Sequence, residues 1–547
     1  MPIHVGGTPI GARTIFVALL ASMGGFLFGY DSGQISGIQE MPRFIEAFST
    51  EPGPRVTWPD IAQFNSWLLG LIVSSLSIGT FIGVLLGAPL ADRLGRRAAM
   101  SIETLVFSLG VVIQVTAFEA WWQVAIGRGV SGLGVGALSA VVPVYMGETV
   151  PSQLRGSCVA CYQLFITLGI LVSNLINLGT REISSSASWR LPIVIGIPFA
   201  AILGLGIWLC PESPRWLVSR GRNDQAYAGL SVMRGLTKGT ADAWVEADYA
   251  AIITAHEKDS KMRPAGWLDC FRVENKTLHR TLLGIMVQAL QQLTGANFFF
   301  YFGPTIFQGV GVADPFVVAV ILGAINVFCT FLGLYALERF GRRIPLIVGA
   351  AGMAVWLIVF ATAGTVGDPS SRPIGTLLIV AASFFILFYA STWAPGAWLF
   401  IGESFSGRTR AKQAALGAAS NWAWNFMISF FTTPIVSSID LAYGYVFAGC
   451  MVFATVFAYF FVYETKDLQI EQVDEMYNDP AAKPWNSRKW VPAGYTARNQ
   501  LKEEKSDVLA VEDPQHGEWR SQPDPVTGEE RDTVRKHKET PQRTQDA

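Results

Sequence analysis

Long apolar segments separated by short charged stretches dominate the pattern of this chain. Segments without any Asp, Glu, Lys or Arg cover residues 14–30, 61–91, 104–118, 129–147, 156–180, 191–211, 281–313, 315–337, 344–367, 373–402, 413–439 and 441–463. A helix needs about 20 residues, at about 1.5 Å per residue, to cross about 30 Å of hydrocarbon. The segment at 104–118 reaches that length if Glu103 lies at the interface, and 129–147 if its span begins at Trp121 and includes Arg128. The pattern therefore predicts an all-α membrane protein with twelve transmembrane helices.

Composition agrees with a bilayer protein and excludes several other classes. Of 547 residues, 51% are hydrophobic and 15% are charged, whereas soluble domains carry about a quarter charged residues. The net charge of −1 gives no indication of nucleic-acid binding. The six cysteines are scattered, and the Cys158/Cys161 pair sits in an apolar segment, which favours packing over redox or metal chemistry. We expect no cofactor, no metal and no cleaved signal peptide.

Basic residues in the short loops predict the orientation. With the N-terminus inside, the inner short loops carry ten Lys and Arg residues and the outer loops carry five, which places both termini in the cytosol. The cytosolic pieces are then residues 1–13, the loop 212–280 and the tail 464–547. The tail is polar and poor in large apolar residues, so we expect it to be mostly disordered after about 480.

An internal repeat predicts how the helices are grouped. ADRLGRR at 91–97 returns as LERFGRR at 337–343, and MGETVPSQLRG at 146–156 returns as IGESFSGRTRA at 401–411. The two members of the first pair follow the second span of their halves, and the two members of the other pair follow the fourth span. The repeat predicts two six-helix halves, 14–211 and 281–463, joined by a cytosolic helical loop at 212–280.

Charged residues at the cytosolic helix ends form a candidate gate. Arginine can pair carboxylates in a bidentate way, and a network of such pairs could close the inner face in one state and separate in the other. An ordinary interfacial charge that fixes topology is the alternative, because single exposed pairs contribute only about 0–1 kcal/mol. The candidates are Asp92, Arg93, Arg97, Glu148, Arg155, Glu212, Arg215, Glu338, Arg339, Arg343, Glu403 and Glu464.

Several motifs together resemble one known family. They are GYDSGQISG (29–37), DRLGRR (92–97), GRGVSGLGVG (127–136), PESPRWL (211–217), QQLTGANFFFYF (291–302), ERFGRR (338–343), WAPGAW (393–398), NWAWNF (421–426) and YETKDL (463–468). In this order and spacing the chain resembles the sugar porter family of the major facilitator superfamily, and more narrowly fungal hexose (monosaccharide) transporters. The resemblance covers residues from about 14 to 477. It implies the major facilitator fold and alternating-access transport of a monosaccharide, with glucose as the first candidate, across the plasma membrane.

Neutral amides inside the spans are the candidate sugar ligands. Asn and Gln both donate and accept hydrogen bonds, as sugar hydroxyls do, and an aromatic face suits the C–H side of the ring. Gln291, Gln292 and Asn297 are five to six residues apart, so they converge only if the seventh span is broken, and Gly295 offers a weak point. The other candidates are Gln163, Asn326, Asn425, Trp398, Trp422 and Phe28, and the resemblance adds Tyr301 as an outer-gate aromatic. Interhelical hydrogen bonds of about 0.6 kcal/mol are the alternative role for each amide.

One departure from the family bears on substrate preference. Mammalian glucose facilitators carry a glutamate in the tenth span, eight residues before the tryptophan, where this chain has Ala390. One hydroxyl contact is then absent or is supplied by another group. The preferred sugar, the affinity and the oligomeric state are not fixed by the sequence.

A lone acid in the first span is the candidate proton site. Counting residues places Asp31 and Arg128 at similar depths, about 7–11 Å below the outer surface. An unpaired charge within a span costs at least about 2.5–3.5 kcal/mol, so we expect the two to pair. The resemblance agrees, because an Asp and an Arg at these positions couple protons in plant and bacterial sugar–proton symporters. No histidine lies within a span, which leaves Asp31 as the proton carrier that the sequence predicts.

Three functional hypotheses stay open at this stage. Proton-coupled symport is the first, with a monosaccharide as substrate and a proton as co-substrate. Passive hexose facilitation is the second, because yeast-type facilitators also keep an acid in this motif and use it without coupling. A glucose sensor that signals through its cytosolic tail, with partners unknown, is the third. No nucleophile–base or metal-ligand constellation indicates an enzyme.

Overall fold

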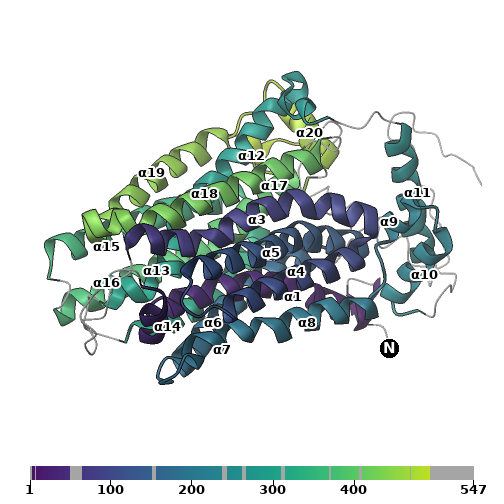
Figure 1. The fold of residues 1–547 in the computed structure, drawn as a ribbon. Coiled ribbons are helices and arrows are strands. Elements are labelled where there is room, and N and C mark those ends of the chain that lie inside the picture. Colours follow the sequence, from purple (N-terminus) through teal and green to yellow (C-terminus); the bar gives the residue numbers. More distant parts are fainter. Residues whose placement is uncertain are drawn as a thin grey trace, which may run out of the picture.

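The computed structural model describes residues 3–5, 8–10, 12–49, 65–150, 155–236, 243–261, 266–308, 314–368, 371–405, 409–468 and 470–492. Long helices run side by side along one direction, and a group of short helices lies at one end of them (Figure 1). The prediction of an all-α membrane protein is confirmed for these residues, apart from a short antiparallel pair of strands, β1 (Ile3–Val5) and β2 (Thr8–Ile10).

The first half of the bundle contains six spans. They are α1 (Ala12–Ile38), α3 (Ser66–Leu94), α4 (Arg96–Val115), α5 (Trp121–Thr149), α6 (Arg155–Thr180) and a sixth span made of α7 (Ala187–Val194), α8 (Gly196–Gly206) and η1 (Ile207–Leu209). Helix α3 packs on α5 and α1 packs on α6. Glycine permits this close approach, since a Cβ at Gly29 would collide with the carbonyl oxygen of Ile166.

The second half repeats the arrangement with two interrupted spans. The seventh span consists of α12 (Thr277–Gln292) and α13 (Ala296–Gln308), and the tenth of α16 (Arg372–Phe388), the π-helical turn η4 (Tyr389–Trp393) and α17 (Ala394–Ser404). The others are α14 (Pro315–Phe340), α15 (Arg343–Val366), α18 (Arg410–Ile439) and α19 (Tyr443–Phe461), the last two joined by η5 (Asp440–Ala442).

Twelve spans are predicted, although a helix-by-helix count of membrane-spanning length gives a smaller number. Ten helical runs in the described chain are long and apolar enough to cross a membrane. One of these runs, Lys412–Phe461, contains α18 from Lys412 onward and all of α19, and the broken seventh span is too short in each of its two pieces to be counted. The two six-span halves thus account for twelve crossings.

Short elements gather at one end of the bundle, which we call the loop end. They include α9 (Pro214–Ser219), α10 (Asn223–Met233), α11 (Ala243–Lys261), η2 (Leu268–Phe271), η3 (Glu274–Lys276), α20 (Ile470–Asn478) and η6 (Ser487–Lys489). The N-terminus lies at the same end (Figure 1). Helix α20 is tied to the bundle by an ion pair from Arg280, which is buried on α12, to Asp474. The tail from residue 493 onward lies outside the described residues.

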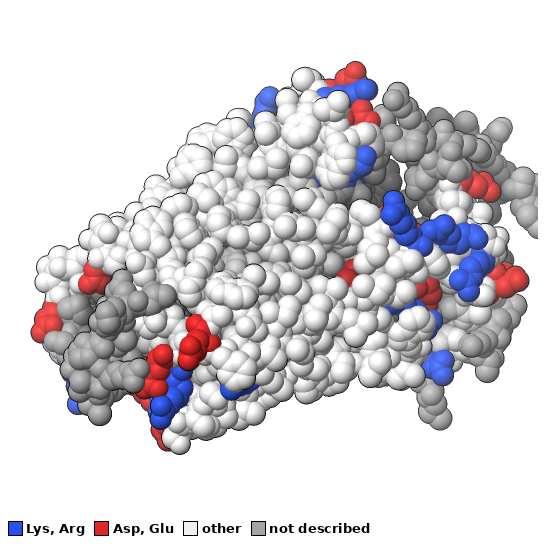
Figure 2. Space-filling model, viewed as in Figure 1, with Lys and Arg blue, Asp and Glu red and all other residues white. Residues whose placement is uncertain are grey.

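The opposite end, which we call the far end, carries α2 (Pro42–Phe48) and the start of α14. Charged side chains gather at the two ends, and a broad band between them carries almost none on the face that Figure 2 shows. This is the distribution expected for a protein whose middle lies in hydrocarbon. The two halves meet where α18 packs on α3, α14 on α6 and α13 on α1.

Candidate functional site

The seventh span breaks at the place that the spacing of its amides requires. Helix α12 ends at Gln292 and α13 begins at Ala296, with Gly295 between them at φ 86°, a conformation that favours glycine. A Cβ at Gly295 would also lie 2.7 Å from the ring of Phe447. Because of the break, the Asn297 amide donates a hydrogen bond to the Gln292 side-chain oxygen.

Gln292 is the centre of a buried amide network. Its Nε2 donates to Asn421 Oδ1 at 2.8 Å, and its oxygen also accepts from Asn425 Nδ2 at 3.3 Å. Asn425 lies 3.3 Å from the hydroxyl of Tyr301. Four of the predicted sugar ligands, on α12, α13 and α18, are therefore brought together. Another predicted ligand, Gln291, donates to the backbone oxygens of Trp393 and Ala394 at 3.2 and 3.0 Å, and its side-chain oxygen accepts from Asn421 of the network.

Three residues of the network were missed by the sequence analysis. Asn421 Nδ2 donates to Gln288 Oε1 at 2.7 Å and to Gln291 Oε1 at 2.6 Å, so this one side chain orients three glutamines. Ser77 of the first half donates to Asn425 Oδ1 at 2.6 Å, which carries the network across the interface. The i, i+3, i+4 spacing of the glutamines and the i, i+4 spacing of the two asparagines were the signals available.

The remaining predicted sugar ligands lie around this network or apart from it. Phe28 of α1 and Trp422 of α18 meet edge to face, with ring centroids 5.0 Å apart. Gln163 on α6 and Trp398 on α17 are half-buried. Asn326 on α14 is buried, and its side-chain oxygen has no hydrogen-bond partner among the described residues. The aromatic pair thus joins the two halves, while these other side chains form no hydrogen bond with Gln292 among the described residues.

Asp31 and Arg128 are both buried, but they are not joined by an ion pair in this conformation. One carboxylate oxygen of Asp31 accepts from the amide of Gln34, and the other has no hydrogen-bond partner in the described chain. Arg128 donates to the backbone oxygens of Ile72 and Val73 on α3, at 3.0 and 3.5 Å. The two charges still interact electrostatically with each other and with Tyr301. The expected ion pair is therefore not formed in this conformation, in which the arginine is held on α3.

A second buried carboxylate was not anticipated. Glu103, at the start of the 104–118 segment, is 2% exposed on α4, in the stretch of the helix that packs on α5. Neither of its carboxylate oxygens has a hydrogen-bond partner among the described residues. The hydroxyl of Tyr162 on α6 also has no hydrogen-bond partner among the described residues, and it interacts electrostatically with the Glu103 carboxylate. Seven residues of α4 precede Glu103 from the loop-end start of the helix.

At the loop end the same arginine–glutamate ion pair occurs once in each half. In the first half, Arg96 forms an ion pair with Glu148 at 3.0 Å, and in the second half Arg342 pairs Glu403 with contacts of 2.6 and 2.9 Å. A hydroxyl supports each acid, from Ser213 at 2.6 Å and from Thr465 at 2.7 Å. The pairing arginine is the first of each GRR doublet, and the sequence analysis had named its neighbours instead.

A second acid in each half holds the backbone of the same turn. Glu212 accepts hydrogen bonds from the amides of Arg96 and Arg97, and Glu464 accepts from those of Arg342 and Arg343. The second arginine of each doublet lies over an aromatic ring, Arg97 over Trp208 and Arg343 over Tyr459, at 4.7 and 5.1 Å. The repeat in the sequence is therefore a repeat in three-dimensional structure, and each ion pair lies within one half.

The other gate candidates are more loosely placed. Asp92 contacts Arg96 at 3.2 Å but is 70% exposed. Arg93, Glu338 and Arg339 are exposed, and their side chains form no ion pair in the described chain. Arg215 lines a cavity described below, and the side chain of Arg155 lies outside the described residues.

The glycine before each doublet yields a stability prediction. Gly95 and Gly341 both adopt φ 92°, and a Cβ at either position would collide with the carboxylate of Glu212 or Glu464. We expect Gly95→Ala and Gly341→Ala each to cost about 1–3 kcal/mol of stability. Thermal melting of the purified protein measures this. Gly449→Ala, where a Cβ meets nothing within 4 Å, should melt like the parent; equal melting of all three variants would contradict the role of the turn.

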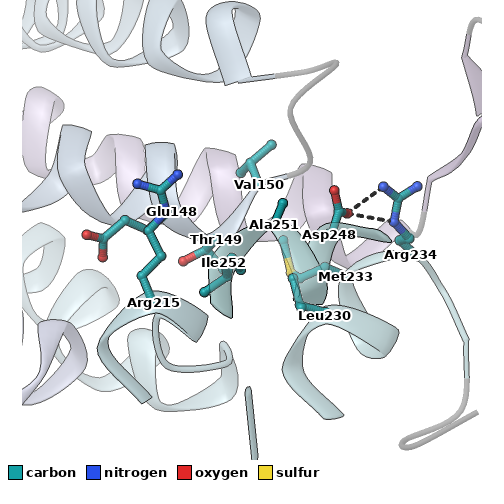
Figure 3. Close-up of a pocket in the computed structure, with 10 residues that line it drawn as sticks. All are labelled: Glu148, Thr149, Val150, Arg215, Leu230, Met233, Arg234, Asp248, Ala251 and Ile252. Atoms are coloured by element: carbon teal, nitrogen blue, oxygen red, sulfur yellow. Dashed lines mark hydrogen bonds and ion pairs between the residues drawn. The ribbon is translucent and has the colours of Figure 1, made fainter. Parts of the chain in front are cut away.

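A cavity of about 250 Å³ lies beside the first-half ion pair of Arg96 and Glu148 and not at the amide network. It is lined by the end of α5 and by α9, α10 and α11 (Figure 3). On one side of the cavity Arg234 holds Asp248 through two hydrogen bonds of 2.5 and 3.1 Å. Glu148 and Arg215 lie at the other side. The cavity thus lies between Glu148 of the first-half ion pair and the Arg234–Asp248 pair of the short helices.

This arrangement defines a multi-pass membrane transporter, and comparison with known proteins identifies its family. The family described as "Sugar (and other) transporter" matches residues 17–477. The chain belongs to this family. It is a sugar transporter and not an enzyme.

Relatives of known activity are similar over most of their length. The low-affinity glucose transporter HXT1 of Saccharomyces cerevisiae is 39% identical over 483 residues, covering 87% of this chain and 83% of the relative. The high-affinity fructose transporter ght6 of Schizosaccharomyces pombe is 41% identical over 485 residues, covering 87% and 88%. These relatives confirm the predicted resemblance to fungal hexose transporters.

Solved structures confirm the fold. The xylose transporter XylE of E. coli, in a partially occluded inward open conformation, is similar with a TM-score of 0.69 and 25% identity over 83% of this chain and 99% of that one. A structure of the major facilitator superfamily proton:xylose symporter XylE bound to 6-bromo-6-deoxy-D-glucose gives a TM-score of 0.68 at 25% identity, covering 85% and 99%. The major facilitator fold is therefore shown.

Proposed function

We propose that this protein takes up a hexose by alternating access, with glucose as the leading candidate substrate and a proton as co-substrate. It would do so in the plasma membrane with the loop end facing the cytosol. The observation that carries the sugar site is the amide network around Gln292. Its amides bond to one another across α12, α13 and α18, and each can exchange those partners for sugar hydroxyls.

The position of the network suits alternating access. Ser77 reaches Asn425 from the first half, and Phe28 meets Trp422 across the same interface. A sugar bound there would contact both halves, so movement of one half against the other could expose it to either side in turn. The curated relatives carry glucose and fructose, which supports a hexose as the substrate.

Proton coupling is supported by the environment of Asp31. The residue is fully buried, and its side chain shares a polar cluster with Gln34, Arg128 and Tyr301. Tyr301 also belongs to the sugar network. Protonation of Asp31 would remove its attraction for Arg128, which here is held by α3. The proton site and the sugar site would then be linked through Tyr301 and the packing of α1, α3 and α13.

Uptake by cells that lack their own hexose transporters tests the substrate. We expect saturable uptake of labelled glucose, with unlabelled hexoses competing. Binding of glucose without any uptake would instead support the sensor hypothesis. Uptake of a pentose with no competition by hexoses would contradict the proposed substrate class.

Glu103 provides a test of which acid carries the proton. Glu103→Gln should leave sugar accumulation and its pH dependence unchanged, because among the described residues this carboxyl has no cation beside it whose release could move a helix. Accumulation ratios at two external pH values measure this, with protein level as the control. Loss of accumulation in this variant, with exchange retained, would transfer the proton role from Asp31 to Glu103.

A further inference from the structure

An ion pair joins the two halves at the far end of the bundle. Arg181 directly follows α6 of the first half, and its guanidinium contacts the carboxylate of Asp314, which directly precedes α14 of the second half. The side chains are 25% and 32% exposed, so water screens the pair only in part. Both residues lie just outside the apolar spans.

The contact is held in place from both sides. Asp314 uses one carboxylate oxygen to cap α14, accepting from the amide of Phe316 at 3.0 Å, and its other oxygen contacts Arg181. The guanidinium of Arg181 lies over the ring of Phe316, 5.2 Å from its centroid. Two groups of the second half therefore hold one side chain of the first. By contrast, Glu182, the other acid near Arg181, is 85% exposed and belongs to the first half.

The packing beneath the pair shows what it would control. Helices α6 and α14 contact each other, and Asn174 of α6 donates to the backbone oxygen of Ala319 on α14 at 3.2 Å. Gln39, which follows α1, donates to the backbone oxygen of Tyr301 on α13 at 2.9 Å, so the far end is bridged at a second place. The repeated ion pairs at the loop end lie within single halves.

We propose that Arg181 and Asp314 form a lock that holds the far end closed, and that it breaks when the protein opens toward that side. They are positioning residues, because they act through α6 and α14 and touch no part of the amide network. The proposal rests on the alternating access proposed above. It assigns to this pair a share of the free-energy difference between the two end states.

The lock should be insensitive to pH over the range in which uptake is measured. Burial alone would raise the pKa of Asp314, but the hydrogen bonds from Arg181 and the Phe316 amide bring it below its usual value of about 3.9. Arg181 and, through it, Glu182 are the charged groups near Asp314 in the described chain. A carboxylate with a depressed pKa keeps its pair above that usual value and loses it only as pH falls through the lowered pKa. A change in uptake between about pH 5 and 8 therefore has another origin.

Distances between spin labels test the lock directly. Labels at Glu119→Cys and Val366→Cys, both exposed near the far end of their own halves, would be placed in the full chain with its six cysteines replaced by alanine. Asp314→Asn keeps the helix cap but removes the charge. We expect it, and Arg181→Gln, to raise the ratio of long to short distances about two- to fivefold. The double variant should show the same shift as each single variant.

Glu182→Gln is the matched control, since it removes an acid beside Arg181 without crossing between the halves. Its distance distribution should match that of the parent. Distances in Asp314→Asn and Arg181→Gln that coincide with the parent, or an equal shift in Glu182→Gln, would overturn the lock. Helical content shows whether each variant folds. Because Asp314→Asn and Arg181→Gln remove opposite partners of the same pair, one of them still tests the lock if the other fails to fold. Because the labels report without sugar, loss of transport alone would count against the proposed function and not against the lock.

Discussion

Replacing Asp31 with asparagine should abolish accumulation of sugar while sparing its equilibrative exchange. The amide has almost the shape of the carboxyl and can still accept from Gln34, but it cannot carry a proton. A proton driven by 100 mV supplies about 2.3 kcal/mol, and one pH unit adds about 1.4 kcal/mol. Together they allow accumulation of roughly several hundredfold, which should fall to a ratio of about one in the variant.

The steady-state ratio of a non-metabolised glucose analogue in transporter-null cells measures this loss. Counterflow of labelled sugar from preloaded cells measures the retained exchange. Glu103→Gln is the matched control, because it neutralises the other carboxylate that is buried in the described part of the same half. Undiminished accumulation by Asp31→Asn would refute the proton role, whereas loss of both accumulation and exchange would show that Asp31 supports the structure of the site.

Gln292→Leu should raise the KM for glucose by about 10- to 100-fold. Leucine fills much of the same space but cannot hydrogen-bond, so the substitution removes the group that joins Asn297, Asn421 and Asn425. These partners would then face a hydrocarbon surface, and a bound sugar would lose one ligand while the others lose their orientation. Initial rates of glucose uptake over a range of concentrations give the KM.

Gln114→Leu separates sugar binding from the general cost of removing a buried amide. Gln114 is 1% exposed on α4 and donates to Ser131 at 3.0 Å, within the first half and away from the network. Its loss should lower thermal stability and leave the KM unchanged. A similar KM for both variants would mean that the amides around Gln292 serve only as interhelical hydrogen bonds.

Much of the fold could be predicted because a membrane imposes simple requirements on the sequence, chiefly the length and the lack of charge of each span. Uncharged segments of spanning length give the spans, and the broken seventh span follows from the distance between Gln292 and Asn297 together with Gly295. The internal repeat gave the two halves, and the structure extends it to Glu212 with Ser213 and Glu464 with Thr465, which occupy equivalent places.

Directions of side chains around a helix were harder to predict. Depth counting placed Asp31 and Arg128 at one level, but it does not give the face of α5 from which Arg128 reaches the carbonyl of Ile72. In each GRR doublet, charge alone does not distinguish the arginines. The turn at Gly95 starts α4 at Arg96, which directs this side chain toward Glu148.

Partners across helices were hidden for a similar reason. Asn421 occurs in a motif with Asn425 and Trp422, yet its three glutamine contacts arise only when α18 packs on α12. Glu103 showed the opposite problem. A single acid near the start of a span looks interfacial in sequence, and its burial depends on α4 packing against α5.

Coupling of sugar movement to proton movement is the central claim, and purified protein in sealed vesicles tests it most directly. The vesicles would contain a pH-sensitive dye, and glucose would be added outside without any imposed gradient. The account predicts that glucose entry acidifies the lumen and that an inward proton gradient drives glucose above its external concentration until a protonophore is added. Glucose entry with no change in lumenal pH, and no accumulation under the gradient, would contradict it.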